Sequence, residues 1–270
     1  MAVVPPAATL GSTAGPRNNS ASLRRALGIL LRIGEDSADG RGHTLAGLSR
    51  DLELNKSTLL RLLAPLCEAR LVEQEPDTGR YRLGWRTAQL GAAYLEQADL
   101  PGAARDVLRG LMEETSETVH LVLADLPEVI YIDKVDSPRP VRMFSRIGTR
   151  QPAYSTAVGK AILAHAGDPA VRRVIEAGLP ARTPRTHTTA AALRADLAEI
   201  RARGYAVDDV ENEPEIRCVA APIFDHAGTV GSAVSVSAPA SRLGAGQVPA
   251  LGGLVVAAAD QVSRRLGARR

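Results

Sequence analysis

Four polar residues that can contact nucleic acid, Lys56, Ser57, Thr58 and Arg61, lie within a leucine-rich segment. If this segment is a helix, they share the face opposite its leucines. Arginine pairs bidentately with guanine, while serine, threonine and lysine contact phosphates or base edges. These residue types suit a helix that reads the major groove. Taken alone, however, a charged face favours the alternative, a small helical interaction module whose polar face is simply solvated.

The elements around this segment decide between these interpretations. Apolar spacing predicts a helix over Ser22–Ile33, with an apolar stripe of Leu23, Ala26, Leu27, Leu30 and Leu31. Thr44 and Asn55 are suited to N-cap the next two helices. Strands are predicted at Leu71–Glu75 and Tyr81–Leu83, joined by the turn sequence Pro76–Gly79.

Three helices followed by a hairpin is the order of a winged helix-turn-helix, which strongly favours DNA binding. Arg80 and Arg82, near the hairpin tip, are placed to reach a flanking phosphate or the minor groove. The candidate DNA-binding residues are therefore Thr44, Asn55, Lys56, Ser57, Thr58, Arg61, Arg80 and Arg82.

Pro65 lies inside the third predicted helix. Proline has no N–H to donate to the carbonyl of Arg61, and this interruption costs about 3 kcal/mol. We therefore expect either a kink at Pro65 or a base-reading part that ends near Ala64.

The second half of the chain mixes predicted strands with helices and indicates an α+β domain. Residues 1–19 are expected to form a disordered leader and residues 20–84 the winged helix-turn-helix domain. A linker helix, Trp85–Gln97, falls within a connection of residues 85–100, and residues 101–270 form the second domain. The predicted elements of that domain are strands at Thr118–Ala124, Glu128–Val135, Tyr205–Asp208, Cys218–Phe224 and Val230–Ser237, and helices at Pro101–Thr115, Ser155–Ala166, Pro169–Ala177, Ala190–Arg203 and Gln247–Leu266.

Composition sets limits on the cellular setting. The 270 residues carry a net charge of only +3, so a DNA-binding surface must come from local placement of basic side chains. Cys67 and Cys218 lie far apart without metal-ligand spacing, which predicts a reduced compartment and no metal site. The N-terminus does not resemble a signal peptide, and the longest apolar run, near Leu251–Ala259, is too short to span a membrane. We expect a cytoplasmic protein without a cofactor.

Several motifs together resemble the IclR family of bacterial transcription regulators, over about Ser22 to Leu266. The motifs are the segment Asn55–Leu63, the hairpin sequence Gly79–Gly84, and, in the second half, Glu117–Leu121, Ser155–Ala161, Gly204–Tyr205 with Asp208–Asp209, and Arg217–Ile223. The resemblance implies a homodimer or dimer of dimers on a palindromic operator. It also implies an effector domain with a GAF-like antiparallel sheet and flanking helices.

The resemblance further implies a pocket for a small organic acid or related catabolite, formed by Ala157, Val158, Asp208, Cys218, Ser235 and Ser237. Ser155 is predicted to N-cap the helix that begins there, an end that favours anions. Ser235 and Ser237 share one strand face by their period of two. Met143, Phe144 and Ile147 are expected to form an apolar lid.

Each of these residues also has a purely structural interpretation. Cys218 can be a core residue, the two serines can be satisfied by backbone groups, and Asp208 can be a solvated strand end. His120 is expected to be a strand residue with a local partner and not a metal ligand.

Two other functions stay open at this point. A hydrolase using Cys218, His120 and an aspartate is conceivable, but no activating motif flanks the cysteine, so no catalytic residue is expected. The other possibility is a DNA-binding protein without an effector, in which the second half is structural only.

Overall fold

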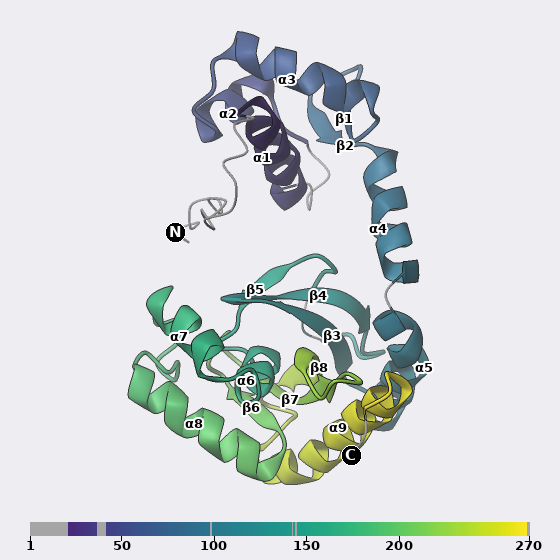
Figure 1. Ribbon diagram of the computed structural model, residues 1–270. Coiled ribbons are helices and arrows are strands. Elements are labelled where there is room, and N and C mark those ends of the chain that lie inside the picture. The colour runs from purple at the N-terminus through teal and green to yellow at the C-terminus, as the bar shows by residue number, and fades with distance from the viewer. Residues whose placement is uncertain (1–20, 37–41, 98, 142, 144, 269–270) are drawn as a thin grey trace. The chain divides into compact units, whose positions relative to one another are not determined.

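The computed structural model describes residues 21–36, 42–97, 99–141, 143 and 145–268 (Figure 1). The expected leader, residues 1–19, and Phe144 lie outside this range. The chain divides into two compact units, one ending at Gln97 and one following it, and each is described by itself.

The first unit is a small helical domain with a hairpin. Its core contains Ile29 and Ile33 of the first helix, Leu48 of the second, the buried leucines of the third, and Val72 and Tyr81 of the hairpin. The hairpin turns at Gly79, which has a φ of 67° and whose N–H donates to the carbonyl of Glu75 (2.8 Å). The elements are α1 (Ala21–Asp36), α2 (Leu45–Asp51), α3 (Lys56–Glu68), β1 (Val72–Gln74), β2 (Tyr81–Leu83) and α4 (Trp85–Gln97).

The apolar stripe predicted on α1 is divided between core and surface. Ala26 and Leu30 pack against the core beside Ile29 and Ile33. Leu27 and Leu31, one helical turn apart, are 42% and 56% exposed. The helix therefore has a second apolar strip that the fold of this unit does not bury.

Helix α3 continues through Pro65 to Glu68, so it does not end near Ala64. Pro65 lies on the exposed side of the helix, opposite the buried residues Leu62, Leu63 and Leu66. The helix resumes its hydrogen bonding at once, since the N–H of Ala69 donates to the carbonyl of Pro65 (3.0 Å). Core packing on the opposite face keeps the segment helical despite the bond lost at Arg61.

The second unit is built on a six-stranded sheet in the order β5-β4-β3-β8-β7-β6, with each neighbouring pair antiparallel (strands labelled in Figure 1). Strand β5 was not predicted from the sequence, and the other strands agree with the predicted ones to within two residues at each end. The strands are β3 (Thr118–Asp125), β4 (Glu128–Val135), β5 (Arg150–Pro152), β6 (Ala206–Asp209), β7 (Ile216–Phe224) and β8 (Val230–Pro239).

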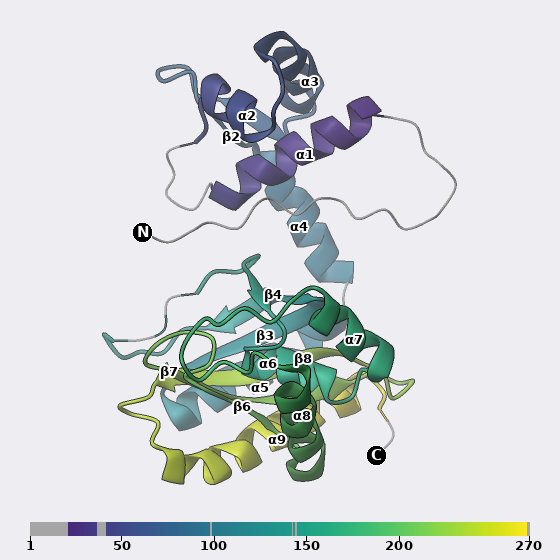
Figure 2. The same cartoon turned by 90° about the vertical axis from the view of Figure 1, so that its left-hand side faces the viewer.

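Helices cover both faces of this sheet in three layers (Figures 1 and 2). One face packs on α5 (Asp99–Thr115) and α9 (Val248–Arg265) through a core that includes Val219, Val234 and Val236. The other face packs on α6 (Ala157–Leu163), α7 (Asp168–Glu176) and α8 (Ala190–Arg203). The predicted α+β class is confirmed. Among the described residues, no helix is both long and apolar enough to cross a membrane.

Candidate functional site

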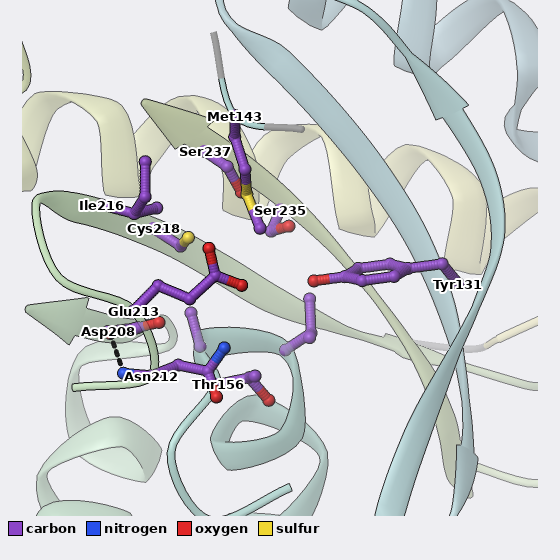
Figure 3. Close-up of a pocket in the computed structure, with 12 residues that line it drawn as sticks. Tyr131, Met143, Thr156, Asp208, Asn212, Glu213, Ile216, Cys218, Ser235 and Ser237 are labelled. Carbon is purple, nitrogen blue, oxygen red and sulfur yellow. Dashed lines mark hydrogen bonds between the residues drawn. The ribbon is translucent and has the colours of Figure 1, made fainter. Parts of the chain in front are cut away.

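A cavity lies between the start of α6, the β6–β7 connection, the first residues of β7 and the second half of β8 (Figure 3). The cavity is narrow, since the space open to the centre of a water-sized sphere is about 10 Å³. It lies on the face of the sheet that α6 covers. On this face Gly159 lets α6 approach the backbone of Ala153 closely. Its lining residues are Tyr131, Met143, Thr156, Ala157, Val158, Asp208, Asn212, Glu213, Ile216, Cys218, Ser235 and Ser237.

Of the nine residues predicted for the pocket and its lid, the structure brings seven together, and Phe144 lies outside the described residues. Met143, Ala157, Val158, Asp208, Cys218, Ser235 and Ser237 all line it. Ser235 and Ser237 enter from β8 as their period of two predicted. Ile147 does not line it: this residue is 55% exposed, because it lies in the turn that precedes β5 and its side chain faces solvent.

The N-cap of α6 is Thr156 and not Ser155. The Thr156 hydroxyl accepts a hydrogen bond from the N–H of Gly159 (3.2 Å). Ser155 is buried and its Oγ donates to Oδ1 of Asn212 (2.9 Å) in the β6–β7 connection. The prediction was wrong by one residue, because two adjacent hydroxyl residues can both cap a helix and a distant partner takes the first.

Asp208 is held at the end of β6 by the loop that follows it. Its Oδ1 accepts hydrogen bonds from the N–H groups of Glu211 (2.7 Å) and Asn212 (3.2 Å). Burial raises the pKa of Asp208 to about 7, partly offset by these backbone bonds. Asp208 is therefore a buried, pinned carboxyl group in the cavity wall and not a solvated strand end.

His120 lies behind the cavity wall, where it contacts the lining residues Tyr131 and Ser237 and also Ser145 of the adjoining cavity. Its Nε2 is 2.7 Å from Oγ of Ser145, its Nδ1 is 3.3 Å from Oγ of Ser237, and its ring packs against Tyr131 at 4.8 Å between centroids. Burial lowers the pKa of His120 to about 4, so the imidazole is neutral at pH 7. The expected local partner is confirmed.

The chemistry of Cys218 opposes the hydrolase alternative. The side chain belongs to the buried core as well as to the cavity. Burial raises the pKa of Cys218 well above its ordinary value, so the group is a thiol and not the thiolate that a nucleophile requires.

The cavity includes five residues that the sequence did not single out: Tyr131, Thr156, Asn212, Glu213 and Ile216. Tyr131 comes from β4, on the far side of β3 from β8, so only the strand order reveals it. Met143 and Tyr131 also line an adjoining cavity with Ser145, Arg146, Thr149 and Gln151.

In the first unit, α3 presents Lys56, Ser57 and Arg61 on its exposed face, with Thr58 half-buried. Thr44 caps α2 by accepting from the N–H of Gly47 (3.1 Å). Asn55 caps α3 by accepting from the N–H of Thr58 (2.8 Å). Both predicted N-caps are confirmed.

The two arginines of the hairpin differ in their surroundings. Arg80 is half-buried and donates to the carbonyl of Gly42 (3.1 Å), so it fastens the hairpin to the segment before α2. Arg82 is exposed, with its guanidinium 3.8 Å from Glu73. Of the two, Arg82 is the more available to a polyanion.

Comparison with known proteins decides the family. The sequence profile for the IclR helix-turn-helix domain matches residues 22–76, and the profile for the bacterial transcriptional regulator IclR C-terminal domain matches residues 92–264. The chain belongs to the IclR family. It is a DNA-binding transcription regulator with a C-terminal effector-binding domain, and the family and its relatives are regulators and not enzymes.

Individual IclR relatives resemble this chain over nearly their whole lengths. The regulator BhcR of Paracoccus denitrificans is 36% identical over 92% of this chain and 88% of its own. The solved structure of an IclR regulator from Silicibacter sp. TM1040 is similar with a TM-score of 0.80 and 32% identity, covering 92% of this chain and 97% of that one. A structure of an IclR homologue from Microbacterium hydrocarbonoxydans, complexed with 4-hydroxybenzoate, has a TM-score of 0.79 and 25% identity over 91% of this chain and 99% of its own.

Proposed function

We propose that the cavity of the second unit binds the effector of this IclR regulator, a small organic acid or related catabolite, and that its binding changes operator affinity. The observation that carries this proposal is the convergence of Asp208, Cys218, Ser235 and Ser237 with the start of α6 in the lining of one cavity. The complex of the Microbacterium homologue with 4-hydroxybenzoate, an organic acid, supports the same class of ligand.

The lining suggests how such an acid is held. The hydroxyls of Ser235 and Ser237 and the first N–H groups of α6, at Ala157 and Val158, supply hydrogen-bond donors for a carboxylate. Met143, 5% exposed, covers the ligand as an apolar contact. The alternative, a second unit with a structural role only, does not explain why these polar groups converge on one cavity.

Removal of the two serine hydroxyls tests the pocket. The double variant Ser235→Ala/Ser237→Ala is expected to weaken effector binding about 5- to 150-fold, because two hydrogen bonds of about 0.5–1.5 kcal/mol each are lost. Isothermal titration with 4-hydroxybenzoate and a panel of aliphatic hydroxy acids measures the effect, with operator release as a second readout.

Ser232→Ala is the matched control, since Ser232 is buried on the same strand but does not line the cavity. The double variant and the control should retain the melting temperature to within a few degrees. Equal affinity in all three proteins would contradict the pocket, and silence of the whole panel would favour the effector-independent alternative.

We infer that the exposed face of α3 reads the operator. Lys56, Ser57, Thr58 and Arg61 would contact base edges and phosphates, Thr44 and Asn55 would lie next to phosphates at the helix starts, and Arg80 and Arg82 would flank them from the hairpin. Arg61 is the residue whose side chain best fits direct base readout, because its guanidinium matches guanine bidentately.

Arg61→Ala is expected to weaken operator binding by about 1–3 kcal/mol and to relax specificity at one base pair. Arg109→Ala is the control: this arginine is exposed on α5, outside the first unit, and its loss changes the net charge equally. Titration of a labelled operator fragment and of single-base variants measures both effects. An Arg61 variant that binds like the Arg109 variant would exclude base readout.

We further propose a homodimer, or a dimer of dimers, on a palindromic operator. The exposed strip of Leu27 and Leu31 on α1, together with Leu90 on α4 (58% exposed), offers apolar surface that a second copy would bury.

In this proposal residues 20–84 bind DNA, residues 85–100 connect the two domains, and residues 101–270 bind the effector and self-associate. An effector that favours one arrangement of the copies would change the spacing of two α3 helices through α4. Such a protein acts in the cytoplasm, where operator and catabolite meet.

A further inference from the structure

Glu213 brings an unpaired carboxyl group into the cavity. It lies in the β6–β7 connection, and Figure 3 shows its side chain and that of Tyr131 both extending into the cavity. Among the described residues, none donates a hydrogen bond to its carboxylate. The side chain is half-buried, and burial raises the pKa of Glu213 above its ordinary value, with Arg182 opposing the rise.

Asp208, the other carboxyl group of the cavity, differs from Glu213 because it accepts hydrogen bonds from within the protein. Two backbone N–H groups of its own loop satisfy Oδ1 of Asp208. Arg182 does not provide such hydrogen bonds to Glu213, since its Nε donates to the carbonyl of Asn212 (3.0 Å). The protein thus supplies two donors to the carboxyl group of Asp208, while the carboxyl group of Glu213 is available to a ligand.

The charge of the lining residues also indicates which ligand groups Glu213 can accept. Two of its residues, Asp208 and Glu213, are acidic, and none of the described lining residues is basic. Arg146 lines only the adjoining cavity, which shares Tyr131 and Met143. A second negative charge placed against Glu213 would meet like-charge repulsion in a space of reduced dielectric constant. A hydroxyl or ammonium group there would donate a charge-assisted hydrogen bond.

We propose that Glu213 determines effector specificity: it selects acids that present a hydrogen-bond donor at the β6–β7 end of the cavity and rejects dicarboxylic acids. This proposal rests on the effector pocket proposed above and adds the chemistry of the ligand's second end. A hydroxy or amino monocarboxylic acid satisfies both ends, with its carboxylate on the serine hydroxyls and its donor on Glu213.

The test uses probes of matched size on the full-length protein. Calorimetry compares 4-hydroxybenzoate, 4-aminobenzoate, benzoate and benzene-1,4-dicarboxylate, and an aliphatic set compares 4-hydroxybutanoate, 4-aminobutanoate, butanoate and butanedioate. The native protein is expected to bind the donor-bearing member of a set at least tenfold more tightly than the unsubstituted acid, and the dicarboxylate most weakly.

Glu213→Gln keeps the shape of the side chain but removes its charge and adds a donor. It is expected to improve dicarboxylate binding at least tenfold and to reduce the preference for the donor-bearing acid. Glu215→Gln is the matched control, because Glu215 is exposed two residues away in the same connection. It should leave every ratio unchanged, and equal melting temperatures show that both variants fold.

Three outcomes would overturn the proposal, and they are distinguishable. If the affinity ratios between the acids of each set are the same in the native protein and in Glu213→Gln, Glu213 does not determine specificity, although the pocket still binds acids. An equal shift in Glu215→Gln assigns the effect to net charge. If neither set binds any of the proteins, the acid-binding pocket itself fails, and the role of Glu213 fails with it.

Discussion

Replacement of Lys160 by methionine is expected to lower the free energy of unfolding by about 3–5 kcal/mol. The Lys160 side chain is fully buried in α6, with Nζ 2.7 Å from Oδ2 of Asp196 and 2.6 Å from Oε1 of Glu211. Methionine preserves most of the volume but removes the buried ammonium group from both carboxylates. Asp196 keeps a longer ion pair with Arg203 (Nη2 to Oδ1, 3.7 Å), so the loss falls mainly on the buried Glu211. His187 lies 3.3 Å from Oδ2 of Asp196 and is partly exposed, so it does not replace a buried ammonium group.

Urea denaturation of the full chain, followed by the fluorescence of tyrosine and by circular dichroism, measures this loss. The triple variant Lys160→Met/Asp196→Asn/Glu211→Gln is the control, because it removes the uncompensated charges together with the lysine. It should recover a large part of the lost stability. A single variant within about 1 kcal/mol of the native protein would contradict the importance of the ion pairs.

Lys160→Met is also expected to affect the cavity, through the backbone of Glu211. Glu211 also donates its N–H to Oδ1 of Asp208, so a displaced Glu211 takes away one of the two bonds that hold the Asp208 carboxyl group. Effector affinity should therefore fall in Lys160→Met even at temperatures where the protein is folded.

Gly159→Ala is expected to destabilise the second unit by about 3 kcal/mol or to prevent its folding. A Cβ on residue 159 would overlap the Cα, carbonyl carbon and carbonyl oxygen of Ala153. These are backbone atoms that cannot rotate away, so α6 would have to move from the sheet and from the cavity whose edge it forms. Thermal and urea denaturation give the loss.

For Gly110→Ala, the same chemical change at another glycine, we expect the protein to become more stable. Gly110 lies inside α5 and an added Cβ would meet nothing within 4 Å. Alanine there should stabilise the protein by about 0.5–1 kcal/mol through helix propensity. Similar shifts in the two variants would show that close packing at residue 159 has no special role.

Local patterns predicted the elements because local chemistry decides them. The side chains of Thr44 and Asn55 accept hydrogen bonds at helix starts, and the turn before Gly79 joins the hairpin as expected. The alternation of Ser235 and Ser237 along β8 was sufficient to place both in one cavity. Such features depend on residues within a few positions of one another.

Long-range partners explain what the sequence could not predict. Ser155 loses the capping role because Asn212, far along the chain, engages its hydroxyl. Glu213 belongs to a connection without periodicity, so nothing in the pattern sets it apart from Glu215, although one lines the cavity and the other is exposed. On α1, a leucine repeat does not reveal which of two apolar strips the unit buries.

Strand β8 has consequences for how a protein of this kind changes during evolution. Its odd-numbered residues Ser235 and Ser237 line the cavity, while the alternating Val234, Val236 and Ala238 pack in the core with α5 and α9. If the cavity binds the effector as proposed, substitutions at the odd positions would alter ligand preference while the even positions keep the helices attached. A descendant would then acquire a new effector in single mutational steps without losing the fold.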